Sequence, residues 1–358
     1  MKIIQIFPGK VWGGAEQYVI DLGEALKERG HEVVYVARRS RAVTDRLSGS
    51  VDFISMPFTG AYNPAASWWM TRLLKTASPD VIHIHDTSFV PVVVRAKHFC
   101  RSDVRIVLTR HVARASHTNP LYRAYFRQIH RMVFVSELSR KLWIGANKWM
   151  PGSRCRVVLN SIPDACRYNG RSLREHYGIA PDVPIIMFTG RVRRSKGCEV
   201  IIRALAEIKD LPFVMVFVGA CKPAGYDAVL ARMAGESGIG DRVFFYGFTD
   251  DARSLVRQAD IGIAPSIVRE ACPLSPMEFM QAGKCVITSN NGAQPEYIHQ
   301  RQTGLLIPPG DELWLADALK ILLCQPDMRA RLGAAAKGYF DRNMSYDIFV
   351  DKILAAYN

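Results

Sequence analysis

The chain has 358 residues, 49% of them hydrophobic and 22% charged, a composition typical of folded globular domains that excludes disordered and fibrous classes. This length favours two domains over one. The longest strongly apolar runs, such as Phe213–Val218, fall far below the roughly 18 residues that a membrane-spanning helix needs.

The positive charge is unevenly distributed. Of the formal net charge of +14, residues 1–165 carry +12, from 24 Lys and Arg against 12 Asp and Glu. The remaining residues carry only +2, from 23 against 21. This asymmetry predicts that the first half faces an anionic partner, whether a membrane surface, an acidic glycan or a nucleic acid.

The cysteines and the N-terminus both point to the cytoplasm. The eight cysteines show no paired C-x-x-C spacing, which favours reduced thiols over a disulfide framework or a zinc site. The N-terminal apolar stretch is broken at Pro8 before a signal-peptide core could form, so it reads as a first strand. We therefore expect a cytoplasmic protein.

Short β-rich runs alternate with helical patterns along the whole chain, which predicts parallel sheets covered by helices. In the first half the expected strands are Lys2–Phe7, Glu32–Ala37, Phe53–Met56, Val81–His85, Arg105–Thr109, Met132–Val135 and Arg156–Leu159. After the polar stretch 164–172 the expected strands are Ile185–Thr189, Phe213–Val218, Val243–Tyr246, Ile261–Ala264, Val286–Thr288 and Leu305–Ile307. The apolar spacing predicts helices over Cys198–Ile208, Leu313–Leu323 and Tyr346–Tyr357.

A glycine-bearing turn follows the first expected strand and opens a helix. Its adjacent glycines, Gly13 and Gly14, would let the backbone approach a ligand closely, and the helix N-terminus would offer free N–H groups to an anion. A tight turn without a ligand is the alternative for this motif taken alone.

The first strand of the second half leads into a basic loop. Gly190 begins it, and Arg191 and Lys196 supply a planar guanidinium and a compact ammonium that together suit a diphosphate. The alternative is a solvated basic turn, but the position after a strand favours binding.

Two carboxylates, Glu270 and Glu278, lie eight residues apart after the expected strand Ile261–Ala264. They bracket a loop and the first turns of a helix, and carboxylates are good acceptors for vicinal sugar or ribose hydroxyls. Two ordinary surface acids are a weak alternative in a segment otherwise rich in Cys, Pro, Leu and Met.

These motifs, taken together, resemble family 4 of the retaining glycosyltransferases with the GT-B fold. The hallmark is the Glu, seven residues, Glu spacing, and the resemblance spans essentially the whole chain in family order. It is carried also by Gly13–Glu16, Asp80–His85, Thr109–His111, Val135–Glu137, Asn160–Ile162, Gly190–Arg191 with Lys196–Gly197, and Gly292–Glu296.

The resemblance implies an architecture. We expect an α/β protein with two facing Rossmann-like domains and a cleft between them that closes on the donor. The N-terminal, acceptor-side domain would comprise residues 1–165 together with a C-terminal helix, 342–358, crossing back onto it. Residues 166–341 would form the nucleotide-sugar domain.

The resemblance also implies roles for individual residues. Arg191 and Lys196 would hold the donor diphosphate, Glu278 the ribose, and Glu270 the hydroxyls of the transferred sugar. Gly190 and the backbone amides around Leu274 and Ser275 would contact phosphate or sugar. From the other domain, Gly13 and Gly14 would meet the diphosphate or the acceptor, and His111 would stand beside the transferred sugar. We interpret His83 and His85, in an alternating strand, as structural.

The chain departs from the family after the first carboxylate, where Cys272-Pro273 replaces the usual Phe-Gly. Proline has no N–H, so a backbone donor at that position is lost.

The implied reaction is transfer of a hexose-type sugar from a UDP-, GDP- or ADP-sugar to a glycan or lipid-linked acceptor, with retention of configuration. Cell-surface polysaccharide or lipopolysaccharide synthesis is the expected setting. The chain lacks an Asp-x-Asp pair, so we expect neither a metal nor another cofactor, and Arg191 and Lys196 to supply the electrostatic stabilisation. Front-face attack would need no protein nucleophile.

Two other functions remain open. A sugar-nucleotide epimerase or a phosphorylase would share the architecture, since fold alone does not fix function. A basic nucleic-acid-binding protein would explain the charge, but no recognised module for that purpose is present, so we expect no nucleic-acid partner.

A final pattern concerns the basic half. Between Asp103 and Glu137 the chain has six arginines and no acid. If Asn119-Pro120 starts a helix, Arg123, Arg127 and Arg131 form one stripe beside aromatic residues. This predicts docking on the anionic inner membrane face; a solvated face is the alternative.

Overall fold

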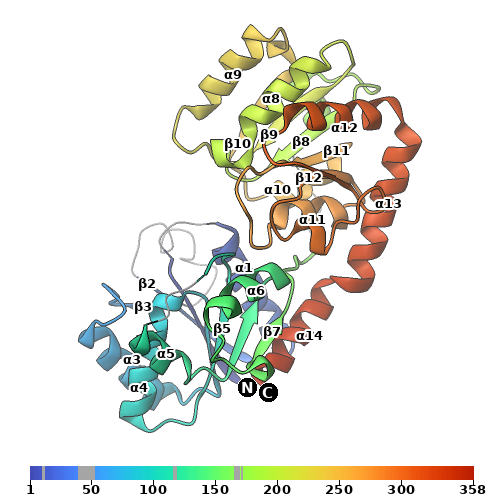
Figure 1. Cartoon of the computed structure of the whole chain (residues 1–358). Helices are drawn as coiled ribbons and strands as arrows, with labels where there is room; N and C mark the ends of the chain where they lie inside the picture. The colour runs from blue at the N-terminus through green and yellow to red at the C-terminus, as the bar shows by residue number, and fades with distance from the viewer. Residues whose placement is uncertain (10–12, 39–52, 116–118, 165–169, 171) are drawn as a thin grey trace. The chain divides into compact units, whose positions relative to one another are not determined.

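A computed structural model describes residues 1–9, 13–38, 53–115, 119–164, 170 and 172–358 (Figure 1). The chain divides into two compact units. Unit 1 comprises Met1–Asn160 with Tyr346–Asn358, and unit 2 comprises Ser161–Ser345. The last helix, α14 (Tyr346–Tyr357), is thus part of the unit that contains the N-terminus.

Unit 1 is built on a seven-stranded parallel sheet in the order β3-β2-β1-β4-β5-β6-β7. Its strands are β1 (Lys2–Phe7), β2 (Glu32–Arg38), β3 (Phe53–Met56), β4 (Val81–Ile84), β5 (Arg105–Arg110), β6 (Arg131–Phe134) and β7 (Cys155–Val157). Its other helices are α1 (Gly14–Glu28), α3 (Pro64–Ala77), α4 (Val90–Cys100), α5 (Pro120–Phe126) and α6 (Glu137–Ala146), with short 3₁₀ turns at Thr87–Phe89 and Gly152–Arg154.

The strands of unit 1 are buried on both faces, as continuous apolar runs in a parallel sheet require. Ile4 and Ile6 of β1 face one core, which α3, α4, α5 and α6 help to cover. Ile3 and Phe7 face the opposite core, which includes residues of α1 and α14. The two cores follow directly from the alternation of side chains along β1.

Helix α14 is bound to unit 1 by packing and by charge. Ile353 and Tyr357 are fully buried. Arg29, just after α1, pairs with Asp347 at 2.8 Å and also with Asp351. The helix therefore completes the core of unit 1.

Unit 2 has a six-stranded parallel sheet in the order β10-β9-β8-β11-β12-β13. The strands are β8 (Ile185–Thr189), β9 (Val214–Val218), β10 (Val243–Gly247), β11 (Ile261–Ala264), β12 (Cys285–Ser289) and β13 (Leu305–Ile307). The helices are α7 (Leu173–Tyr177), α8 (Cys198–Glu207), α9 (Tyr226–Glu236), α10 (Ala252–Leu255), α11 (Leu274–Gln281), α12 (Glu312–Cys324) and α13 (Pro326–Asn343). Short 3₁₀ turns lie at Arg194–Lys196, Gly240–Arg242, Val256–Gln258 and Gln294–Glu296.

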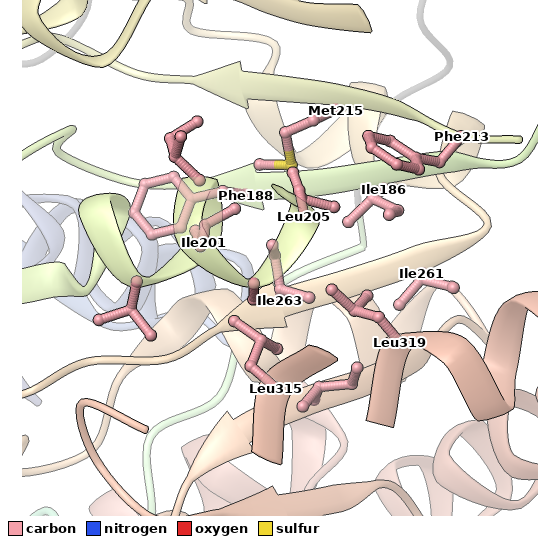
Figure 2. Close-up of a cluster of buried hydrophobic side chains, with 14 of the residues drawn as sticks. Ile186, Phe188, Ile201, Leu205, Phe213, Met215, Ile261, Ile263, Leu315 and Leu319 are labelled. Atoms are coloured by element: carbon pink, nitrogen blue, oxygen red, sulfur yellow. The ribbon is translucent and has the colours of Figure 1, made fainter. Parts of the chain in front are cut away.

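Figure 2 shows one core of unit 2, where α8 and α12 cover the sheet. Ile201 and Leu205 of α8 and Leu315 and Leu319 of α12 pack against strand residues such as Ile263. These helical residues recur at the spacing that predicted both helices.

The predicted strands are all present, with ends shifted by at most two residues, and the predicted helix Tyr346–Tyr357 is found as α14. One expectation is wrong. The helix that begins after Asn119 ends at Phe126, so Arg127 is its C-cap and Arg131 opens strand β6. Arg123, Arg127 and Arg131 therefore do not form one helical stripe. Tyr122, Tyr125 and Phe126 turn towards the core.

In the part of the chain that the structure describes, no helix has the length and apolar character to cross a bilayer.

Candidate functional site

The candidate site in unit 2 lies where the strand order reverses. Strands β8 and β11 are neighbours in the sheet, although β9 and β10 come between them in the sequence. The connections from β8 therefore run to one side and those from β11 to the other, which leaves room for a ligand beyond the carboxyl ends of these strands. Both predicted motifs of this half, the basic loop and the paired carboxylates, follow these two strands.

The loop after β8 is fixed against the loop after β11. Gly197 has φ +78°, and a Cβ at this position would lie 2.1 Å from the carbonyl oxygen of Pro265, so only glycine fits. The backbone N–H of Ile267 and the hydroxyl of Ser266 both donate to the carbonyl of Ser195, each at 3.1 Å. Lys196 lies between Ser195 and Gly197, so its backbone is held in a defined position.

Lys196 and Glu270 form an ion pair. The Lys196 Nζ donates to Glu270 Oε1 at 2.6 Å, and their side chains are 26% and 16% exposed. The backbone of Glu270 is held in turn, because its carbonyl accepts from the N–H of Ala293 at 3.1 Å. A cation and a carboxylate meet here at the sheet edge, where an arriving anion would compete with Glu270 for Lys196.

Glu278 lies in a second cluster at the same edge. The hydroxyl of Thr189, the last residue of β8, donates to Glu278 Oε2 at 3.1 Å. Ser275 Oγ lies 2.6 Å from Thr189 Oγ1 and must be the donor, since the single proton of Thr189 is already committed. Arg253 approaches the other carboxylate oxygen at 3.8 Å. The carboxylate of Glu278 is thus fixed in position by contacts to both of its oxygens.

The first turn of α11 supplies backbone donors. Pro273 is the N-cap, so Leu274 and Ser275 are the first helical residues, whose N–H groups have no intrahelical acceptor. Pro276 follows them and has no N–H. The proline at 273 therefore leaves the two donors at Leu274 and Ser275 in place.

Gly190 and Arg191 complete the loop. Gly190 has φ +127°, and both residues are exposed. No ion pair involves Arg191 among the residues that the structure describes. The structure thus brings Lys196 to Glu270, and it brings Thr189 to both Ser275 and Glu278, whereas Arg191 is exposed to solvent.

In unit 1 the corresponding switch point lies between β1 and β4. Gly13 is the N-cap of α1 and Gly14 its first residue, while residues 10–12 of the preceding loop lie outside the described part of the chain. His111 follows β5 directly. These three predicted residues thus all lie at the carboxyl edge of this sheet.

His111 is held by a network of buried polar groups. His85 Nε2 lies 2.6 Å from Gln5 Oε1, so this nitrogen is the donor. His85 Nδ1 is then an acceptor for His111 Nε2, 3.2 Å away. His111 is left with an unprotonated Nδ1. Tyr18 packs edge-on against His111 at 4.7 Å between ring centroids.

A second branch of the network runs through His83. Its Nε2 lies 2.7 Å from Thr109 Oγ1 and its Nδ1 lies 2.8 Å from Tyr357 Oη. Burial lowers the pKa of His83 to about 3 and that of His111 to about 4, and it holds the pKa of His85 well below its usual range. All three rings are neutral. His83 is buried inside the sheet, whereas His85 contacts His111 and positions it.

Three residues at these edges were not predicted. Thr189 and Gln5 are polar residues in otherwise apolar strands, a signal that was present in the sequence. Arg253 lies on the four-residue helix α10 and belongs to no motif. Only the fold brings it to Glu278.

Comparison with known proteins agrees with this geometry. The family model described as Glycosyltransferase Family 4 matches residues 12–165. The family model described as Glycosyl transferases group 1 matches residues 170–339. The chain belongs to the family 4 glycosyltransferases. It is 26% identical over 376 residues to a phosphatidyl-myo-inositol mannosyltransferase of Mycobacterium leprae, which covers 100% of this chain and 96% of that relative.

Solved structures confirm the predicted GT-B fold. A glycosyltransferase from Rickettsia africae aligns with a TM-score of 0.87 at 21% identity, covering 99% of this chain and 97% of the other. Anabaena HepE in complex with UDP and glucose aligns with a TM-score of 0.82 at 20% identity, covering 99% and 98%.

The neutral histidines predict a pH dependence of stability. Their pKa values in the folded chain lie below the usual 6.5, so the unfolded chain binds more protons once the pH falls below that value. The free energy of unfolding should therefore decrease as the pH is lowered. The decrease should be about 1.4 kcal/mol per pH unit for each histidine that is protonated only on unfolding.

Urea unfolding at pH values from about 7.5 down to about 5 measures this slope, above the range in which carboxylates titrate. His83→Gln should flatten it. His98→Gln, which replaces an exposed histidine on α4, should leave it unchanged. A slope that His83→Gln does not alter would contradict the assignment.

Proposed function

We propose that this family 4 glycosyltransferase is a retaining, metal-independent enzyme that moves a hexose from a nucleotide diphosphate sugar to a glycan or lipid-linked acceptor. It would act in the cytoplasm, in the synthesis of cell-surface polysaccharide or lipopolysaccharide. The observation that carries this proposal is the pair Lys196–Glu270, held beside the Thr189–Ser275–Glu278 cluster at the switch point of the second sheet.

Each group has a role in binding the donor. Glu278, fixed by Thr189, would accept hydrogen bonds from the vicinal ribose hydroxyls. The N–H groups of Leu274 and Ser275, at the positive end of α11, would receive the diphosphate or the sugar. Gly190 would allow close approach of the backbone, and Arg191, exposed beside it, would turn its guanidinium onto the diphosphate.

The ion pair suggests how donor binding and sugar binding are coupled. When the diphosphate reaches Lys196, it would replace Glu270 as the partner of the ammonium. Glu270 would then accept hydrogen bonds from hydroxyls of the transferred sugar. The pair thus holds both side chains in place before the donor arrives.

In the reaction, the bond between the anomeric carbon and the diphosphate oxygen breaks while the acceptor hydroxyl oxygen bonds to the same face of that carbon. The leaving diphosphate takes the hydroxyl proton. Negative charge grows on the diphosphate, and Lys196 and Arg191 would stabilise it. On the other domain, Gly13, Gly14 and neutral His111 would contact the diphosphate, the acceptor or the transferred sugar.

The names of similar proteins support the substrate classes. HepE was crystallised with UDP and glucose, which favours a nucleotide sugar as the donor. The Mycobacterium leprae relative is named for a phosphatidylinositol acceptor, which favours a lipid-linked acceptor.

Lys196→Ala should weaken the stabilisation of the protein by nucleotide. For the wild type, the nucleotide that binds among UDP, GDP and ADP should add about 2.7 kcal/mol of stability at 100 times its dissociation constant. Lys196→Ala and Arg191→Ala should lose most of this gain, and turnover should fall by about 100- to 1000-fold, because a preorganised charge is removed. Thermal-shift and steady-state assays measure both.

Arg194→Ala is the matched control, since Arg194 lies in the same loop with 80% of its side chain exposed and pairs instead with Glu199. It should behave as the wild type. Full turnover in a folded Arg191→Ala/Lys196→Ala double variant would rule out the assigned roles.

Turnover should survive EDTA, because the sequence has no Asp-x-Asp pair and Lys196 and Arg191 would take the place of a metal. Initial rates with and without chelator, followed by added Mn²⁺, measure this. Loss of activity that Mn²⁺ restores would contradict metal independence.

The product should keep the anomeric configuration of the donor sugar. Proton NMR of the product during turnover reads this directly from the coupling of the anomeric proton. An inverted product would exclude front-face attack, and conversion of the donor without any acceptor would favour an epimerase.

A further inference from the structure

Three helices of unit 1, α3, α4 and α5, cover the same face of its sheet and lie side by side (Figure 1). Their inward residues, such as Met70, Val93 and Phe126, are buried in a common core. Their outward residues form one surface.

The three helices themselves carry positive charge only, and at one end Lys75 lines a pocket together with Asp80 and Asp103 of the adjoining loops. Helices α3, α4 and α5 contain no Asp or Glu, whereas α1, α6 and α14 all contain acids. The cations of α3 and α4 are Arg72, Lys75, Arg95 and Lys97, and α5 adds Arg123. Within the described residues, none of these five forms an ion pair with a carboxylate. These helices therefore contribute five of the 24 cations of residues 1–165, and no carboxylate of the described residues forms an ion pair with them.

Large apolar side chains are exposed among these cations. Trp68 on α3 is 66% exposed and Phe99 on α4 is 64% exposed. Arg72 lies one turn after Trp68, and Arg95 lies one turn before Phe99, so each aromatic shares a helix face with a cation. Each of the two helices thus presents an exposed aromatic ring next to a cation.

Tyr62 joins the helices. The guanidinium of Arg95 lies 5.8 Å from the centre of its ring, and Tyr125 of α5 packs 6.2 Å away. Arg95 also donates to the carbonyl of Ala61 at 3.0 Å, which ties α4 to the segment before α3. We call the outward side of α3 and α4, with Tyr62, the basic face; it carries Tyr62, Trp68, Arg72, Lys75, Arg95 and Phe99.

We propose that the basic face docks the enzyme on an anionic lipid surface. Cations near such a surface gain about fivefold in affinity each, and Trp and Phe insert at the level of the headgroups. A soluble polyanion would account for the cations but not for two large aromatics turned to solvent. The face differs from the expected arginine stripe, because it lies mainly on α3 and α4 and excludes Arg131. It does not rest on the proposed reaction.

Vesicle sedimentation tests this with the full chain. The wild type should bind vesicles of mixed phosphatidylglycerol and phosphatidylcholine, less at high salt, and should bind phosphatidylcholine alone weakly. Arg72→Gln and Lys75→Gln should each weaken binding about fivefold. The double variant Trp68→Ser/Phe99→Ser should weaken vesicle binding at high salt as well, since the contribution of the two aromatic side chains is apolar. All four residues have large exposed fractions, and thermal unfolding confirms that each variant is folded.

Helix α12 of unit 2 provides matched controls. Trp314 is 54% exposed and Lys320 is also exposed, but α12 carries the acids Glu312 and Asp317. Trp314→Ser and Lys320→Gln should leave vesicle binding unchanged. Nucleotide binding and turnover on a soluble acceptor should persist in the basic-face variants.

Equal sedimentation of wild type and basic-face variants would overturn the proposal. So would binding to soluble polyphosphate that exceeds vesicle binding and depends on Arg72 but not on Trp68, since the partner would then be a polyanion. Loss of vesicle binding with turnover intact supports the docking role and is independent of the reaction.

Discussion

The site in unit 2 depends on the contact between Gly197 and Pro265. Strands β8 and β11 are neighbours because the strand order reverses between them, but adjacency alone would leave two separate loops. A glycine without a Cβ lets the first loop rest on the carbonyl of Pro265, and two hydrogen bonds to Ser195 hold it there. This contact places the ammonium of Lys196 within reach of Glu270. Any larger residue at position 197 would separate the charged groups on which the proposed chemistry rests.

The two predicted carboxylates belong to different environments, although both sit at one edge. Glu270 is paired with the ammonium of Lys196, which under the proposed function an incoming diphosphate would take over. Glu278 is held by a threonine hydroxyl and approached by the guanidinium of Arg253. Under the proposed function, Glu270 would change partner when the donor binds, while Glu278 would stay a fixed acceptor. The polar groups at the strand edge of unit 1 are neutral instead of charged. Burial keeps three histidines neutral, and hydrogen bonds connect them to Gln5, Thr109 and Tyr357. This network gives His111 a defined tautomer.

Most of the fold could be predicted for two reasons. Parallel strands that are buried on both faces consist of continuous apolar residues, as in Ile185–Thr189, and apolar residues recur with a helical period in amphipathic helices such as α8. The site motifs could be placed because loops after parallel strands meet at one edge. What the sequence did not reveal depends on three-dimensional context. Arg253 has no motif, and its partner is distant in the chain. The helix after Asn119 was expected to continue to Arg131, but Ile129 is buried and the chain must turn to begin β6, so local spacing of arginines was misleading.

The placement of α14 has a consequence for how the protein is made. Its residues belong to unit 1, yet they follow the whole of unit 2 in the chain. On the ribosome, unit 2 is complete before Ile353 and Tyr357 emerge, and until then one core of unit 1 exposes the apolar surface that they cover. Until then His83 also lacks its hydrogen-bond partner, the hydroxyl of Tyr357. The core of the unit synthesised first is therefore completed only after unit 2 has been synthesised, when α14 covers it.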